Sequence, residues 1–182
     1  MPQPEPARAA YPAKDAAGRL LHPERRRVEE ALGWHKKAYE IRKKFYDSDP
    51  DHQNKTYSAL LATSLTTIGV NFYKLGDYQK ALDHHLEALR LREDAMQPYN
   101  EYIGISSNYI GGTLYKIATT QKKREAIRTA EKALEYLYRA KNIMEEIGNK
   151  EQLKYINHSI EQDLLLLKKL KKGKNYNHHR LK

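Results

Sequence analysis

The sequence predicts an all-α fold, a short helical solenoid of five or six antiparallel helices that ends in a capping helix. Apolar residues recur at steps of three and four along most of the chain, and no period-2 alternation of strand length is present. The phrase that ends at Gly69 has a counterpart 42 residues later at Gly111. Repetition at such a period is typical of stacked helical units that cannot bury their apolar faces alone.

The chain is expected to begin with a disordered lead segment over residues 1–23, because helix-breaking Pro and Gly residues are dense there. The first helix is expected over 24–46, where apolar residues at steps of three, four and seven lie on one face. The Asp- and Ser-rich run at 47–51 also contains Pro50, and these residues favour turns over continuation of a helix.

Five further helices follow by the same reasoning. The second is expected over 56–75, with Gly76-Asp77 as the turn into a third that ends near residue 96, before Pro98. The fourth is expected over 100–119 and the fifth over 124–147, where Gly148-Asn149 is a C-terminal signal. The last, over 151–172, has one apolar and one polar face, as the uncovered end of a solenoid requires. Repeats would thus span 24–148, a capping helix 149–172, and a disordered basic tail 173–182.

Pairs of alanines seven residues apart recur in three of these helices, and Gly69 and Gly111 lie in the helices before two of them. Small side chains at this spacing let two helices approach closely. Close approach also explains the interior glycines, each of which costs a helix about 1 kcal/mol. The alanine pairs are Ala31 and Ala38, Ala81 and Ala88, and Ala133 and Ala140.

This pattern resembles the tetratricopeptide repeat. The matching residues are Leu65, Ile68, Gly69 and Phe72 in a first helix, and Gly76, Tyr78, Ala81 and Ala88 in the turn and second helix. Segments 61–65 and 88–93 look more narrowly like the longer repeats of kinesin light chains and nephrocystin-3-like proteins. The resemblance covers about residues 25–148. It implies a right-handed superhelix whose first helices line a concave groove that binds extended peptides or partner helices.

The sequence departs from the family's pattern at both flanks. The helix with Ala31 and Ala38 looks like the second half of a repeat, and the Pro-rich segment before it cannot supply the first half. Its apolar face must then pack on the next repeat, on the lead segment or on another chain, so self-association is one expectation. Ten more residues separate Gly111 from Ala133 than Gly69 from Ala81, which places 119–130 as extra helix or loop.

The resemblance implies, by position, a set of partner-binding residues in the groove. Asn108 is the most telling of them, because Asn can hydrogen-bond a peptide backbone and has poor propensity inside a helix. An ordinary solvated polar face is the alternative. The Lys and Asn set with which some family members clamp a C-terminal carboxylate is not reproduced, which disfavours recognition of chaperone tails. The candidates are Thr66, Val70, Tyr73 and Lys74 of the middle repeat, and Asn108, Gly112, Tyr115 and Lys116 of the next.

The net charge of +10 favours a polyanionic partner, and an acidic protein segment is the first choice. The tail could be an anion-binding, nuclear-import or membrane-surface segment. The alternative is a solvated helix end whose lysines complement the helix dipole. The tail lysines are Lys168, Lys169, Lys171, Lys172 and Lys174.

No local pattern indicates catalysis, a cofactor or a metal site. The pairs His84-His85 and His178-His179 point to different sides of a helix, and no zinc or phosphate-loop motif is present. No run reaches the length of a membrane span, the N-terminus has no signal-peptide pattern, and the chain has no Cys. A cytoplasmic location is expected, and a nuclear one stays open.

The function predicted is that of a non-catalytic adaptor or scaffold that binds a partner's peptide or helix. Two alternatives remain at this stage: a nucleic-acid-binding helical repeat that uses the basic tail, and an assembly subunit that another chain completes.

Overall fold

The computed structural model describes residues 22–172, and this part of the chain forms six α-helices and no β-strand. The all-α prediction is confirmed, and every helix begins and ends within one residue of the expected limits. The predicted lead and tail segments, apart from residues 22 and 23, lie outside the described residues. The helices are α1 (Pro23–Asp47), α2 (Lys55–Leu75), α3 (Tyr78–Ala95), α4 (Glu101–Thr120), α5 (Lys123–Glu146) and α6 (Lys150–Lys172).

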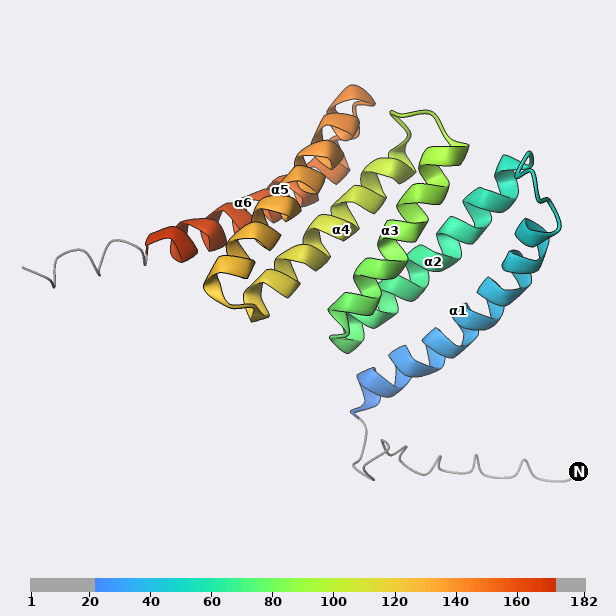
Figure 1. The fold of residues 1–182 in the computed structure, drawn as a ribbon, viewed down its shortest axis with the longest axis horizontal. Helices are drawn as coiled ribbons and strands as arrows, with labels where there is room; N and C mark the ends of the chain where they lie inside the picture. The colour runs from blue at the N-terminus through green and yellow to red at the C-terminus, as the bar shows by residue number, and fades with distance from the viewer. Residues whose placement is uncertain (1–21, 173–182) are drawn as a thin grey trace, which may run out of the picture.

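The helices stand in a row in which each one packs mainly on its neighbours in the chain (Figure 1). The helix α1 lies at one end of the row, and α5 and α6 lie at the other. The last helix, α6, packs on α5 and makes a smaller contact with α4. The fold is therefore a helical-repeat solenoid with two complete helix pairs, α2–α3 and α4–α5, and a single helix at each end.

Side-chain caps explain why three helices start where the sequence predicts. The side chains of Asn54, Asp77 and Asn100 accept hydrogen bonds from backbone N–H groups in the first turns of α2, α3 and α4. Gly76 ends α2 in the left-handed conformation, with φ of 84°, which a glycine adopts without strain. The two-residue turn from α2 to α3 is thus encoded locally.

The glycines of the two pairs face the second helices at close range, as the repeat pattern predicts. A Cβ added at Gly69 would lie 2.5 Å from Cε1 of His85, and one at Gly111 would lie 2.6 Å from Cγ of Leu137. Real Cβ atoms do not approach other atoms this closely, so a larger residue at either position would force the opposing side chain to shift. Four of the six repeat alanines are fully buried: Ala81, Ala88, Ala133 and Ala140.

The ten extra residues of the second pair are helical. Gly69 lies six residues before the end of α2, whereas Gly111 lies nine before the end of α4. Ala81 lies three residues after the start of α3, whereas Ala133 lies ten after the start of α5. Both connecting turns have two residues, so the insertion lengthens α4 and adds about two turns to the start of α5.

The helix α1 packs on α2 through one side only. Leu32 is its one buried residue, and polar links join the two helices: Asn71 Nδ2 lies 2.8 Å from His35 Nδ1, and Arg42 donates to Ser64 Oγ at 2.7 Å. The repeat alanines of α1, in contrast to the four in α3 and α5, are partly exposed. The next repeat therefore covers only part of the apolar surface of α1.

The helix α6 buries one face and leaves the other in solvent. Ile156, Ile160 and Leu167 are buried. Leu164, which the apolar period assigns to the buried face, is 45% exposed, as is its neighbour Leu165 at 46%. No helix within residues 22–172 combines the length and apolarity that crossing a membrane requires.

Candidate functional site

A pocket of about 320 Å³ opens between α2, α3, α4 and α6. Its walls are aromatic and aliphatic, and polar side chains reach it from all four helices, which is the usual make-up of a binding site in a protein. We call it the α2–α4 pocket. It is lined by Val70, Tyr73, Lys74, His85, Asn108, Tyr109, Gly112, Thr113 and Ser159.

The pocket brings together five of the eight residues that the repeat pattern assigns to partner binding. They come from two first helices, α2 and α4, which lie on either side of α3 in the chain and face each other across the opening. The resemblance to the repeat family implies that residues at these positions lie together on the groove side of the first helices. The five are Val70, Tyr73, Lys74, Asn108 and Gly112.

The three other candidates lie outside the lining. Thr66 donates its hydroxyl to the carbonyl oxygen of Ala62 at 2.9 Å, a bond within its own helix. Lys116 and Tyr115 are half-buried, and the Lys116 ammonium lies 5.9 Å from the Tyr115 ring centre. These residues extend the surface beyond the pocket and do not help to enclose it.

Four lining residues were not predicted: His85, Tyr109, Thr113 and Ser159. His85 had a signal in the sequence, because it lies four residues after Ala81 and three before Ala88, on the face that the alanines share. Ser159 had none. It lines the pocket because α6 reaches α4, and no local pattern specifies that contact.

His85 is one of the two most buried polar residues of the pocket, with 1% exposure, as has Thr113. Its ring fills the space beside Gly69 and stacks on Tyr109, with ring centres 5.2 Å apart. Burial, together with the positive charges of His84 and Arg92, lowers the pKa of His85 to about 4. The imidazole is therefore neutral near pH 7.

Two side-chain atoms at the pocket are buried without a hydrogen-bond partner among the described residues. They are Nδ1 of His85 and Oδ1 of Asn108. A buried polar atom without a partner costs about 1 to 3 kcal/mol, so most such atoms are paired. The pocket thus holds hydrogen-bonding capacity that a ligand could use.

The rim of the pocket is aromatic and positively charged. Tyr73 packs edge-on against Tyr78, with ring centres 5.3 Å apart, and burial, followed by the nearby Tyr78 and Tyr115, raises the pKa of Tyr73. Lys74, the next residue, is exposed. No Asp or Glu lines the pocket, so its field favours an anionic group.

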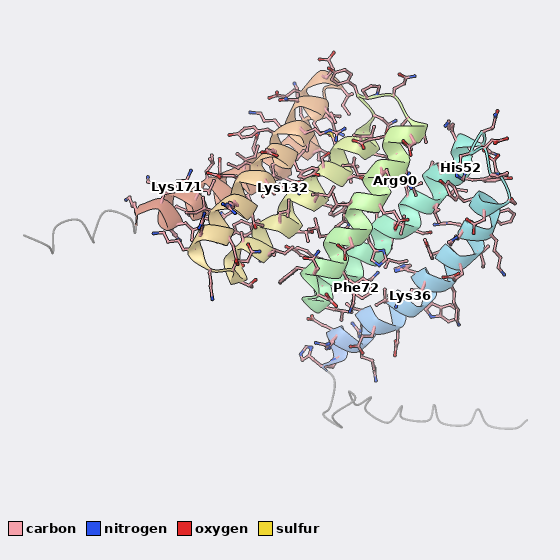
Figure 2. The ribbon with its side chains drawn as sticks, viewed as in Figure 1. Lys36, His52, Phe72, Arg90, Lys132 and Lys171 are labelled. Atoms are coloured by element: carbon pink, nitrogen blue, oxygen red, sulfur yellow. The ribbon has the colours of Figure 1, made fainter. Side chains whose placement is uncertain are left out.

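A second cationic surface lies at the α5–α6 end of the row, where Figure 2 shows Lys171. Lys171 pairs with Glu131 of α5 at 2.9 Å, which uses part of the predicted tail charge locally. A shallow hollow of about 410 Å³ at the start of α5 is lined by Lys123, Arg124, Ile127 and Arg128. Lys168, Lys169 and Lys172 are exposed, and Lys174 lies outside the described residues.

Within residues 22–172, no three His, Cys, Asp or Glu side chains lie close enough together to hold a metal ion. His84 and His85 take different environments, since His84 stacks on Phe72 with ring centres 5.4 Å apart. Neither His is part of a ligand cluster.

Among known families, the tetratricopeptide repeat matches residues 61–98. The matched segment covers most of α2 and all of α3, and it includes Gly69, His85 and the α2 wall of the pocket. Neither the search of curated proteins nor the search of solved structures found a match to this chain.

Proposed function

Because residues 61–98 form a tetratricopeptide repeat, we propose that this protein is a non-catalytic adaptor that holds a segment of a partner protein in the α2–α4 pocket. Repeats of this family generally mediate protein–protein interaction and are typically not catalytic. The finer statement, that the partner binds in this pocket, rests on the geometry of the site.

The single observation that supports the pocket most strongly is its pair of unpartnered polar atoms. Asn108 Oδ1 can accept a hydrogen bond from a peptide N–H, and the neutral imidazole of His85 can donate or accept at Nδ1, depending on its tautomer. A bound backbone or polar side chain would remove the cost of leaving these atoms unpaired. Val70 and Tyr73 supply the apolar surface against which an anchor side chain can pack.

The charge of the surroundings supports an acidic partner segment. Lys74 lies at the rim, Lys116 lies on the same helix as Asn108, and the chain carries a net charge of +10. Complementary charge mainly raises the rate of encounter and selects against basic partners. Apolar contact and the hydrogen bonds would supply most of the affinity.

The proposal can be tested with displayed random 12-residue peptides selected on the purified protein. The selected peptides should be enriched in Asp and Glu around one aromatic or aliphatic residue. Binding of the best fluorescent peptide is then measured by fluorescence polarisation. Asn108→Leu removes the hydrogen-bonding atom while keeping the size of the side chain, and should weaken binding about tenfold or more.

Lys74→Glu should also weaken binding, with a larger effect at low salt because the interaction is partly screened. Lys132→Glu is the matched control, since this lysine lies on α5, away from the pocket lining. Equal binding by wild type, Asn108→Leu and Lys74→Glu would rule out the pocket as the binding site.

The cationic end of the row supports a second candidate function, contact with nucleic-acid phosphates. The inserted turns of α5 place Lys123, Arg124 and Arg128 beside the end of α6, because Leu167 packs with Ala130. The inserted turns of α5 and the lysine-rich end of α6 thus form one basic surface.

The dependence of binding affinity on salt concentration distinguishes the two candidate functions. If this surface binds phosphates, the affinity for a fluorescent 20-base-pair duplex should fall linearly with salt on a log–log plot. Arg124→Glu with Lys168→Glu should flatten that slope, and Lys74→Glu should leave it unchanged. Absence of duplex binding at 50 mM salt would exclude the second function and leave the first untouched.

A further inference from the structure

The most exposed large apolar side chains of α1 lie on a single face. Trp34, Ile41 and Phe45 are 68%, 59% and 53% exposed. Together with Ala31 and Ala38 they recur at alternating steps of three and four, which is the spacing of a helix–helix seam. We call these five residues the α1 stripe.

The repeat pattern indicates that another helix should cover this stripe. In α3 and α5, the alanines that correspond to Ala31 and Ala38 are fully buried, and Ala88 and Ala133 pack in core clusters with residues of the preceding first helix. The helix α1 stands at the end of the row, and no described helix lies beyond it (Figure 1). Exposed apolar stripes of this kind are typical of interaction surfaces.

The stripe is complementary to a second copy of itself in one antiparallel arrangement. With Trp34 opposite Ala38 of the second copy, Ile41 lies opposite Ala31, and the two-fold axis repeats both contacts. Trp34 and Ile41 then each meet a small side chain, which allows the helices to approach and interdigitate. A parallel pairing in register would place Trp34 on Trp34 and give up this fit.

The charges beside the stripe favour the same arrangement. The side of α1 that faces α2 is occupied by His35 and Arg42. The other side carries Glu30, Lys37 and Lys44, one per heptad. In the antiparallel register Glu30 faces Lys44 of the second copy at both ends of the seam, and Lys37 lies nearest the axis.

From this geometry we propose that α1 is a homodimerisation helix, which pairs antiparallel with α1 of a second copy through the α1 stripe. The α2–α4 pocket contains no residue of the stripe, so the dimer would carry two open pockets. A partner that contains two such segments could occupy both pockets, and it would then bind the dimer more tightly than one segment binds a single pocket. The inference is independent of what the pocket binds.

The oligomeric state of the full chain tests the proposal. In light scattering or sedimentation equilibrium, the mass should rise from 21.2 kDa toward twice that value as concentration increases. A seam of one helix face is small, so a dissociation constant on the order of 10 µM is expected. Trp34→Glu and Ile41→Glu should each give a monomer with unchanged helical circular dichroism, because both side chains are exposed in the single chain.

Leu164→Glu is the matched control, since Leu164 is exposed on α6, at the other end of the row, and this variant should leave the dimer intact.

Reversing the charges of Glu30 and Lys44 tests the antiparallel register. Glu30→Lys and Lys44→Glu should each weaken the dimer severalfold, and the double exchange should restore it. Lys37→Gln should strengthen the dimer, because it removes like charges that face each other across the axis.

Several results would overturn the proposal. One is a mass of 21.2 kDa that does not change up to several hundred micromolar. Another is a dimer that survives both Trp34→Glu and Ile41→Glu. A wild-type monomer that dimerises once residues 1–21 are deleted would mean that this segment occupies the α1 stripe of its own chain. Failure of the double charge exchange to restore the dimer would exclude the antiparallel register.

Discussion

The two complete helix pairs have the same backbone plan and different interiors. In α2–α3 the space beside Gly69 is filled by the polar ring of His85, next to the pocket, whereas in α4–α5 the space beside Gly111 is filled by Leu137. The glycine therefore sets how closely the helices approach, and the opposing residue decides whether the interface is only structural or also lines a site.

The two pairs also differ in how they contact the next helix. At the α3–α4 junction the buried Arg92 donates to Ser106 Oγ and lies 5.5 Å from the Tyr102 ring centre. At the α5–α6 junction Asp163 is fully buried, and neither carboxyl oxygen has a hydrogen-bond partner within residues 22–172. One buried ionisable group is partnered and the other is not.

Asp163 and His85 are both buried with unpartnered polar atoms, and they respond to acid in opposite directions. Burial raises the pKa of Asp163 to about 7 and lowers that of His85 to about 4. Between about pH 4 and 7 the folded state holds a proton on Asp163 that the unfolded state loses, so this carboxyl favours folding more as pH falls. Below about pH 6.5 the unfolded state gains a proton on His85 that the folded state excludes, so this ring favours folding less.

The largest expected effect is at Asp163. Asp163→Leu should raise the free energy of unfolding at pH 8 by on the order of 3 to 4 kcal/mol, because it removes an unpartnered buried charge. Below pH 4 the gain should shrink, since the carboxyl is then protonated in both states. Urea denaturation across this pH range measures the difference. A gain that does not depend on pH would mean that Asp163 titrates normally.

The next effect tests whether the glycine contact sets the helix approach. Gly111→Val should destabilise the fold by about 3 kcal/mol, because its side chain would overlap Leu137 and meet the Ala133 carbonyl oxygen, 3.1 Å from the added Cβ. Thermal and urea denaturation measure it. Gly33→Ala, at an open helix position, is the control and should stabilise slightly. If Gly111→Val and Gly33→Ala change the stability equally, Gly111 does not limit how closely α4 and α5 approach.

A third variant makes the two pairs alike. His85→Leu places in α3 the residue type that Leu137 supplies in α5, and it should remove the loss of stability that His85 causes as pH falls from 6.5 to 4. That loss amounts to about 2 to 3 kcal/mol, the cost of keeping the buried ring neutral. Denaturation of wild type and variant at pH 7 and pH 4 measures it. Parallel pH profiles would show that His85 is not the cause.

The helices could be predicted to within one residue because their signals are local. Asn54, Asp77 and Asn100 cap the starts, Gly76 ends α2, and the apolar period gives each buried face. The lining residues that α2 and α4 contribute to the pocket could be predicted from their positions in the first helix of the repeat. Ser159 and the exposed Leu164 could not be predicted, because they depend on how α6 docks against α4 and α5.

The smallest expected effect distinguishes the structural role of Gly111 from that of its neighbour Gly112. Gly112 has no atom within 4 Å of an added Cβ, and it lines the α2–α4 pocket. Gly112→Ala should therefore stabilise the fold by about 0.5 to 1 kcal/mol through helix propensity alone, opposite in sign to Gly111→Val. Thermal denaturation measures the gain. If Gly112→Ala also weakens the selected peptide, the peptide contacts α4 at this position. A destabilised Gly112→Ala would mean that the whole α4 backbone, and not one glycine contact, limits how closely α5 approaches.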